Sequence, residues 1–549
     1  MRSSFMTHTT FSISSLLAMT VFLSGCSAQN VLSDAVEESE ETDTSGYLIV
    51  IEDDPDTLDF QCTSLYYTIA QNGFNRLVET EIGPDGTAEI VPSLAESWTV
   101  SDDGLSYVFH LRDGVTFSNG SPLTSQDVCY SFTRLLTHPN SCNRDIVEVI
   151  RGADELIRGE TDKLEGFEIQ NDLDFEITLK QPYMTFLAGL SMPGASIMDE
   201  ETTAAAGDRF GLDPETMVGT GSFIITDWIP GERILMKANE NCWMGPPACD
   251  GLDLLLVTDD VEIQNLFENG RLDILDLNDL KDAAEFYMHG DIYQNRLHEV
   301  QQVGITYIAL NQTSGVLQDV RVRKALQLAL NRRVLLDAAY AGRGQIENGI
   351  FPKGLIGHND ALEEIPYDPE AARQLLKEAG YPNGFDLTIS ARSSSTPVDV
   401  SLVRLAITMW EEIGVRAKVN IMDESEFMRL RKSGQLDCYA ATWIADYDDP
   451  DNFIYTFYGS PDNTHFRSLN YTNEEVINRV RDARFILNHE ERMKEYQELE
   501  KIIVQDEASW IPLFSRRRYY VSSERLNGFT VSWNGSVKNN YRRMSIEKN

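Results

Sequence analysis

Alternating hydrophobic and polar positions predict β-strands in the first half of the chain. In the clearest run, 107–112, the side chains of Tyr107, Phe109 and Leu111 share one face, and an Asp-Gly pair just before it predicts a tight turn. A continuous apolar run near the start is instead typical of a fully buried strand. We therefore expect strands at 48–51, 107–112 and 175–179, and a strand pair at about 223–236.

Apolar residues spaced three and four apart predict helices, mostly in the second half. After Asp319 they recur up to position 330, and Gly342 lies past the end of the run. Asp368 and Pro369 open a shorter helix that ends at Gly380. We expect further helices after Thr124, at 401–413 and, as a pair, within 472–504. Because strands and helices mix without a regular βαβ order, the predicted fold is α/β, with lobes built from discontinuous segments.

The stretch 441–450 begins as an apolar strand and ends in aromatic and acidic residues. Three of its side chains can line a cleft: Trp443, Asp446 and Tyr447. The backbone groups of Thr442 and Ile444 are expected to remain free to pair with an extended ligand. This combination suits a ligand with an ammonium group and a peptide backbone. The alternative is a half-buried strand followed by a solvated acidic turn.

The N-terminus has the features of an export signal. Residues 13–23 are apolar but too few to span a bilayer, which takes about 20 residues as a helix. The ending Leu23-Ser-Gly-Cys26 resembles a bacterial lipobox, which implies a signal peptide at 1–25 and a lipid on Cys26. Residues 26–46 are then the lipidated cysteine and an acidic tether. A plain signal peptide is the alternative.

Composition limits the classes of function. The 549 residues are 42% hydrophobic and 24% charged, which is typical of a large globular protein. The net charge of −41 argues against binding to nucleic acid or to an anionic membrane surface.

Six cysteines follow Cys26, and an even number outside the cytosol suggests disulfides. The two local candidate pairs are Cys242 with Cys249 and Cys129 with Cys142, and the remainder is Cys62 and Cys438. No cysteine pair has CxxC spacing and the eight histidines are scattered, so we expect no metal site.

An ordered set of motifs runs through most of the chain. Its first part is Pro92-Ser-Leu-Ala-Glu-Ser-Trp98, Ser101-Asp-Asp-Gly104, Tyr107-x-Phe-x-Leu-Arg-x-Gly-Val115 and Phe117-x-Asn-Gly-x-Pro-Leu-Thr-x-x-Asp-Val128. Its second part is Gly219-Thr-Gly-Ser-Phe223, Trp228-x-Pro-Gly231, Asn239-x-x-Cys-Trp243, Asp319-x-Arg-Val-Arg-x-Ala325, Asn331-Arg332, Ala372-x-x-Leu-Leu-x-x-Ala-Gly-Tyr381 and 437–450. The set strongly resembles extracytoplasmic solute-binding proteins of family 5, the peptide/nickel class, and among them the oligopeptide- and dipeptide-binding lipoproteins of ABC importers.

The resemblance implies a two-lobed flytrap fold of mixed sheets, with an extra domain and a hinge between the lobes. By analogy the parts are lobe I at 47–75, 198–303 and 514–549, the extra domain at 76–197, and lobe II at 304–513.

The resemblance also implies site residues. In oligopeptide-binding relatives the aspartate of a Trp-x-x-Asp motif pairs with the peptide ammonium, and here the motif reads Trp443-Ile-Ala-Asp446. We expect Asp446 to bind the ammonium, and the further ligand-binding residues to be Trp443 as a wall, Thr442 and Ile444 through their backbones, Tyr447 and Tyr66. The chain departs from the family pattern at Phe60, where Leu-Asp-Pro is usual, and at Ile444, where some relatives have a cysteine.

We expect the protein to be a monomer without a cofactor. Its expected partners are a peptide ligand, the subunits of an ABC permease and, through the lipid, the membrane. Oligosaccharide stacked on Trp443 and chelated nickel are the alternative ligands. The acids at 446–451 fail the EF-hand calcium pattern. No motif of a hydrolase is present, which makes a peptide hydrolase a remote alternative. A purely structural surface protein is the last alternative.

Overall fold

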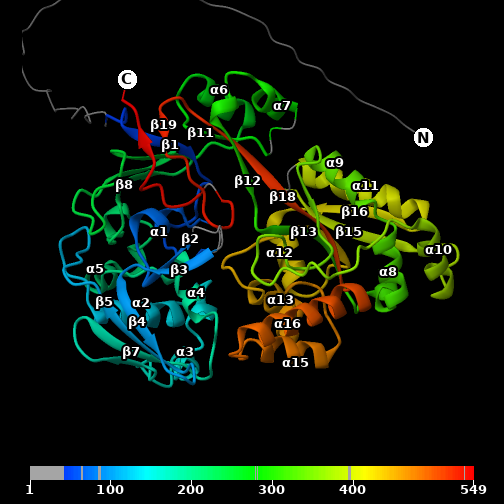
Figure 1. Ribbon diagram of the computed structural model, residues 1–549, viewed down its shortest axis with the longest axis horizontal. Helices are drawn as coiled ribbons and strands as arrows, with labels where there is room; N and C mark the ends of the chain where they lie inside the picture. The colour runs from blue at the N-terminus through cyan, green and yellow to red at the C-terminus, as the bar shows by residue number, and fades with distance from the viewer. Residues whose placement is uncertain are drawn as a thin grey trace, which may run out of the picture. The chain divides into compact units, whose positions relative to one another are not determined.

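The computed structural model describes residues 43–63, 66–83, 88–278, 280, 282–393, 397–536 and 538–548 (Figure 1). The chain divides into two units, Met1–Asp43 and Thr44–Asn549, and every helix and strand given below belongs to the second. The expected signal peptide and Cys26 lie outside the described residues. None of the helices in the described part is both long and apolar enough to cross a membrane.

The segments expected to form lobe I, called lobe I below, contain a four-stranded sheet of order β1-β10-β9-β8. The strands are β1 (Tyr47–Ile51), β8 (Phe223–Ile229), β9 (Arg233–Ala238) and β10 (Gly251–Leu255). β1 runs parallel to β10, and the other pairs are antiparallel. Leu48 and Val50 of β1 are buried, which confirms the first predicted strand.

The elements of lobe I that belong neither to this sheet nor to the largest sheet are short. They are α1 (Thr68–Gly73), α5 (Glu200–Ala206), α6 (Asp260–Glu268), α7 (Asp282–His289), β19 (Leu526–Asn527), β20 (Ser545–Ile546), and the 3-10 turns η3 (Gly207–Arg209), η4 (Pro214–Thr216) and η5 (Gln294–Arg296). β19 and β20 pair with each other close to the C-terminus.

The segment expected to form the extra domain, 76–197 and called the extra domain below, contains a four-stranded sheet of order β4-β5-β7-β6. Tyr107, Phe109 and Leu111 of β5 are buried, as the alternating pattern predicts. Thr124 begins α2 through a capping box with Asp127. The elements are β2 (Val78–Ile82), β3 (Ala88–Pro92), β4 (Ala95–Val100), β5 (Ser106–Leu111), α2 (Ser125–Thr137), η1 (Arg144–Ile146), α3 (Ala153–Ile157), β6 (Phe167–Ile169), β7 (Asp174–Thr178), α4 (Phe186–Leu190) and η2 (Pro193–Ala195).

The largest sheet has the order β11-β18-β13-β17-β15-β16, with β12 and β14 also paired to β18. Its strands are β11 (Ile274–Asp276), β12 (Leu297–Gln301), β13 (Gly304–Leu310), β14 (Gly344–Ile346), β15 (Asp386–Arg392), β16 (Arg416–Met422), β17 (Cys438–Ile444) and β18 (Trp510–Ser522). The long strand β18 pairs with β13 in its first half and with β11 and β12 in its second half (Figure 1). It passes through residue 514 without a break, so it joins the segments expected to form the two lobes.

The helices of the segment expected to form lobe II, 304–513 and called lobe II below, pack on this sheet and on one another. They are η6 (Gly315–Gln318), α8 (Val320–Leu328), α9 (Arg332–Tyr340), α10 (Pro369–Glu378), α11 (Pro397–Glu412), α12 (Glu424–Lys432), α13 (Asp451–Tyr458), α14 (Pro461–Phe466), α15 (Glu474–Ala483), α16 (His489–Lys501) and the π-helical turn η7 (Ile502–Asp506). The helix expected between Asp319 and Gly342 is in fact two helices. Asn331 interrupts the run because its side chain accepts a hydrogen bond from the backbone of Val334 and thereby caps α9.

A buried acid on α16 makes the stability of the fold depend on pH. Glu500 accepts hydrogen bonds from the backbone N–H groups of Ile350 (2.6 Å) and Phe351 (2.8 Å). Burial nevertheless raises the pKa of its carboxyl to about 8. The folded protein therefore holds a proton that the unfolded chain releases near pH 4.5. The resulting stabilisation is complete below that pH and is lost as the pH rises to about 8.

We expect Glu500→Gln to raise the thermal midpoint at pH 8 relative to the unmodified protein, with little difference at pH 5. The shift in pKa corresponds to an effect on the order of 4 kcal/mol. Thermal unfolding from pH 5 to 8 measures it, and Glu498→Gln, an exposed position on the same helix, is the control. If both variants followed the unmodified protein at every pH, Glu500 would not be a neutral buried acid.

Candidate ligand-binding site

A cavity of about 510 Å³ lies where elements from distant parts of the sequence meet. One wall runs from Tyr67 through α1 to β2, and another is the C-terminal segment 530–543. Asp446, just after β17, is the residue of lobe II that lines it. The cavity therefore lies between the two predicted lobes, where a flytrap protein encloses its ligand.

The Asp446 carboxylate opens into this cavity and is held from one side by Asn452. The Asp446 backbone N–H donates to the Asn452 side-chain oxygen (3.0 Å), and the Asn452 amide donates to Oδ2 of Asp446 (3.1 Å). Solvent reaches the Asp446 side chain, but the protein around the cavity raises the pKa of its carboxyl. The raised pKa means that the ionised carboxylate is disfavoured in the empty cavity, and a positively charged ligand group beside it would stabilise the ionised form.

A second carboxylate, that of Asp145, lies close enough to Asp446 for their charges to interact. Burial raises the pKa of Asp145 in the extra domain to about 6, and the negative charges of Glu148 and, more weakly, Asp446 add to the effect. Burial is the main cause of the raised pKa of the Tyr67 hydroxyl, and the negative charge of Asp446 adds to it. The charged residues that line the cavity are of both signs, and Asp145 is not among the described ones, so the attraction for a cation is local to Asp446.

Beyond Tyr439 the outer edge of β17 is not paired with β15, although Thr442 and Ile444 are not among the described residues that line the cavity. β17 pairs with β13 along its whole length, but with β15 only at Cys438 and Tyr439. Ala445 donates its N–H to the carbonyl of Val303, so the alternation of an antiparallel ladder turns the backbone groups of Thr442 and Ile444 away from β13. These groups can therefore accept and donate hydrogen bonds to an extended chain.

Trp443 is packed into lobe II more firmly than the sequence suggests. Its indole N–H donates to the Asn452 side chain (3.2 Å), and its ring meets Phe457 edge-on at 5.4 Å. The guanidinium of Arg467 lies 4.6 Å from the ring centroid. Trp443 is not among the described residues that line the cavity, so these contacts position the strand beside Asp446.

The two predicted tyrosines lie off the cavity. The Tyr447 hydroxyl donates to Asp451 (3.2 Å) inside lobe II, and Tyr66 precedes the residue that does line the cavity, Tyr67. The Tyr67 hydroxyl donates to Asn143 of the extra domain (2.9 Å). Tyr66 and Tyr67 are adjacent in the sequence, and the segment before α1 has no periodicity from which to choose between them.

Sequence reasoning missed the other residues that shape the site. Asp145, Asn452 and Trp533 come from three separate segments, and no local pattern connects them to Asp446. The one available signal in the sequence was the group of turn-forming residues around Trp533. In the structure, the Asn534 side chain of this turn donates to the carbonyl of Ala445 (2.7 Å) and so holds segment 530–543 against the end of β17.

A buried polar network joins the extra domain to lobe II near the cavity. The Tyr183 hydroxyl donates to Asp451 (3.0 Å) and accepts from the Arg484 guanidinium (2.6 Å). Arg484 also pairs with Oδ1 of Asp451 at 3.2 Å, and the Tyr496 hydroxyl donates to the same oxygen. These contacts hold the two parts together in the conformation that encloses the cavity.

The expected disulfides are not present in this structure, where all six described cysteines carry free thiols. The thiol of Cys242 contacts Ser222 and Thr220, whereas that of Cys249 donates to the carbonyl of Gly251 (3.4 Å). Cys129 lies on α2, and the Cys142 thiol instead approaches the carbonyl of Cys62 at 3.4 Å. The short separation in sequence was misleading because the paired side chains have different neighbours.

The fold and the cavity define a solute-binding protein, and comparison with known proteins gives its family. The chain belongs to the bacterial extracellular solute-binding proteins, family 5, whose middle-region model matches residues 89–465. It is 30% identical to heme-binding protein A of Haemophilus influenzae over 94% of this chain and 96% of that protein. It is 28% identical to the dipeptide-binding protein of Escherichia coli over 86% of this chain and 89% of that protein.

Solved structures support the same fold. An ABC transporter-associated periplasmic binding protein from Helicobacter pylori, in complex with the peptide STSA, matches with a TM-score of 0.76 and 23% identity. The match covers 91% of this chain and 98% of the other. The predicted two-lobed α/β fold is thus confirmed, and the chain is a binding protein of an extracytoplasmic family rather than an enzyme.

Proposed function

We propose that this protein captures peptides outside the cell, in the cavity beside Asp446, and delivers them to a membrane ABC permease. It acts as a monomer held at the membrane by a lipid on Cys26. The observation that carries the proposal is a carboxylate at the end of a strand whose outer edge is open. Asp446 binds the peptide ammonium, and the backbones of Thr442 and Ile444 pair with the peptide main chain.

The geometry favours a ligand with a free amino end and a variable sequence. Charge from Asp446 and Asp145 selects the ammonium, and main-chain hydrogen bonds are the same for every peptide. Tyr67 and segment 530–543 close the other side of the cavity. The relatives named as dipeptide- and di/tripeptide-binding proteins support short peptides as the ligand class.

Heme is the second candidate, because one well-matched relative is named heme-binding protein A. The described residues that line the cavity include no histidine, although Tyr67, Met192 and Met244 could each approach an iron. Isothermal titration with a mixed di- to tetrapeptide pool, heme, a saccharide mixture and chelated nickel separates the candidates. Binding of the peptide pool alone supports the proposal, and binding of another ligand without peptides refutes it.

We expect the affinity for a free-amine peptide to fall as the pH is lowered from 7 to 5. The ligand ammonium requires ionised carboxylates, and Asp145 takes up a proton below about pH 6 in the empty protein. Because the pKa of Asp446 is also raised, protonation of Asp446 lowers the affinity further as the pH falls. Titration calorimetry across this range measures the effect, and Asp145→Asn should bind more weakly at pH 7 with a shallower pH dependence. An affinity that held constant or rose toward pH 5 would exclude this electrostatic account.

A further inference from the structure

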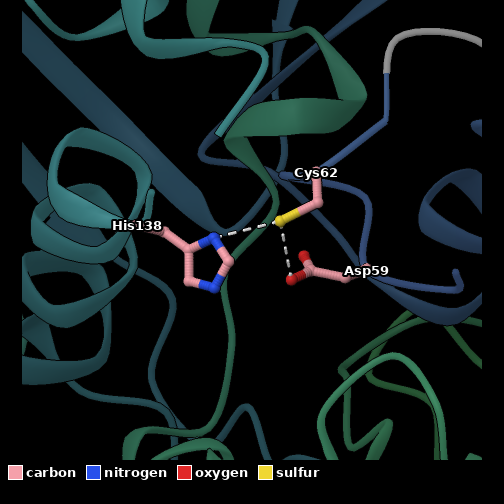
Figure 2. A group of neighbouring side chains, drawn as sticks. All are labelled: Asp59, Cys62 and His138. Carbon is pink, nitrogen blue, oxygen red and sulfur yellow. Dashed lines mark hydrogen bonds between the residues drawn. The ribbon is translucent and has the colours of Figure 1, made fainter. Parts of the chain in front are cut away.

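Three side chains that commonly bind metal ions meet on the border between lobe I and the extra domain, apart from the cavity. Figure 2 shows the Cys62 thiol between the carboxylate of Asp59 and the ring of His138. Its sulfur lies 3.1 Å from Oδ2 of Asp59 and 3.2 Å from Nδ1 of His138. All three ligand atoms are within 4.8 Å of one another.

The three residues come from two segments with a spacing that suits a metal site. Asp59 and Cys62 are three apart in the irregular segment before α1, and His138 is the residue at which α2 ends. Four residues after His138 comes Cys142, whose thiol lies 3.4 Å from the carbonyl of Cys62. Zinc sites typically combine one pair of ligands with two to four residues between them and a second pair with three to five between them, and the two pairs here have two and three. A search for CxxC pairs misses this set because it mixes three residue types.

We propose that Asp59, Cys62 and His138 bind a zinc ion, with Cys142 or a water molecule as the fourth ligand. In a tetrahedral zinc site with a Zn–S bond of about 2.3 Å and Zn–N and Zn–O bonds of about 2.0 Å, sulfur lies about 3.5 Å from nitrogen or oxygen. The present separations of 3.1 and 3.2 Å need to widen by only a few tenths of an ångström. The ion takes the place of the thiol proton, which is released on binding.

Arg134 and the backbone of Gln61 hold the Asp59 carboxylate beside the thiol, and the guanidinium of Arg134 adds a positive charge next to the site. Arg134 pairs with Asp59 through Nη2 and Oδ2 at 2.6 Å. An oxygen with two lone pairs can keep this hydrogen bond and bind the metal, as metal-binding carboxylates commonly do. The backbone N–H of Gln61 donates to the other oxygen, Oδ1, at 3.0 Å and fixes the carboxylate. Replacement of the thiol by a thiolate offsets part of the added positive charge.

Zinc here would join two parts of the chain that are 76 residues apart, the distance in sequence from Cys62 to His138. The segment that carries Asp59 and Cys62 continues to Tyr67, whose hydroxyl contacts Asn143 and the carbonyl of Thr63. A bound ion therefore stabilises the border next to the cavity without occupying it. We expect a higher thermal midpoint with zinc than without it.

The test is titration of the reduced, metal-free protein with Zn²⁺ by calorimetry, and with Co²⁺ by absorption. We expect one ion per chain and a sulfur-to-cobalt charge-transfer band in the near ultraviolet. Cys62→Ser and His138→Gln should each lower the affinity at least about 100-fold, since loss of outer-shell partners alone costs 10–100-fold. Cys129→Ser on α2 and His110→Gln in β5 are the matched controls and should bind as the unmodified protein does.

Cys142→Ser identifies the fourth ligand: weaker binding assigns it to Cys142, and unchanged binding assigns it to water. Equal Zn²⁺ affinity of Cys62→Ser and the unmodified protein would overturn the proposal, as would the absence of a charge-transfer band with Co²⁺. A thiol count showing a Cys62–Cys142 disulfide in the untreated protein would overturn it as well. The thermal midpoints of the metal-free variants show whether a loss of binding reflects a loss of fold.

Discussion

Asp446→Asn should weaken the binding of free-amine peptides by about 30-fold or more while the protein remains folded. Loss of one partner from an enclosed charge pair costs about 2–5 kcal/mol, and each 1.4 kcal/mol is a factor of ten in affinity. Asparagine keeps the size of the side chain and can keep the contacts with Asn452. Calorimetric titration with one dipeptide gives both affinities.

Asp448→Asn is the matched control for this change. Asp448 lies two residues away and accepts a hydrogen bond from the backbone of Ile356 (2.7 Å), which an asparagine oxygen can also accept. It is not among the described residues that line the cavity. The affinity of Asp448→Asn for the dipeptide should match that of the unmodified protein. An equal loss of affinity in both variants would show that Asp446 has no special role in binding.

Asp451→Ala should lower the free energy of unfolding by about 3–5 kcal/mol, the cost of leaving a buried charge without its partner. The Asp451 side chain is fully buried and the paired Arg484 side chain is only 9% exposed. The same carboxylate accepts from the hydroxyls of Tyr183, Tyr447 and Tyr496, which would also lose their acceptor. Urea denaturation measures the change. Because Tyr183 belongs to the extra domain, weaker ligand binding should accompany it.

Asp482→Ala is the control for the buried network. Asp482 is an exposed acid beside Arg481, and a surface pair of this kind contributes less than about 1 kcal/mol. If Asp451→Ala denatured at the same urea concentration as Asp482→Ala, the network would not stabilise the enclosed conformation.

Local patterns predicted the elements because each depends on neighbours in sequence. The alternation in 107–112 became β5, and the capping side chain of Asp368 began α10 as expected. The break between α8 and α9 was missed because the apolar spacing continues through it. A single hydrogen bond that the Asn331 side chain accepts from the backbone N–H of Val334 outweighs that spacing.

The candidate site was predictable only in part, for a physical reason. The stretch ending in Asp446 carries its own signal, because an apolar strand that ends in a carboxylate is visible in one segment. Asp145 is some 300 residues away in sequence and meets Asp446 only when the extra domain packs against lobe II. The same holds for Cys62 and His138, whose meeting depends on the path of two irregular segments.

Native mass spectrometry with a mixed pool of short peptides and an N-acetylated copy of that pool tests the central claim most directly. The account predicts that the protein retains free-amine peptides and leaves acetylated ones, because acetylation removes the charge that Asp446 and Asp145 attract. Retention of neither pool, by protein that is folded and free of endogenous ligand, would contradict peptide capture as its function.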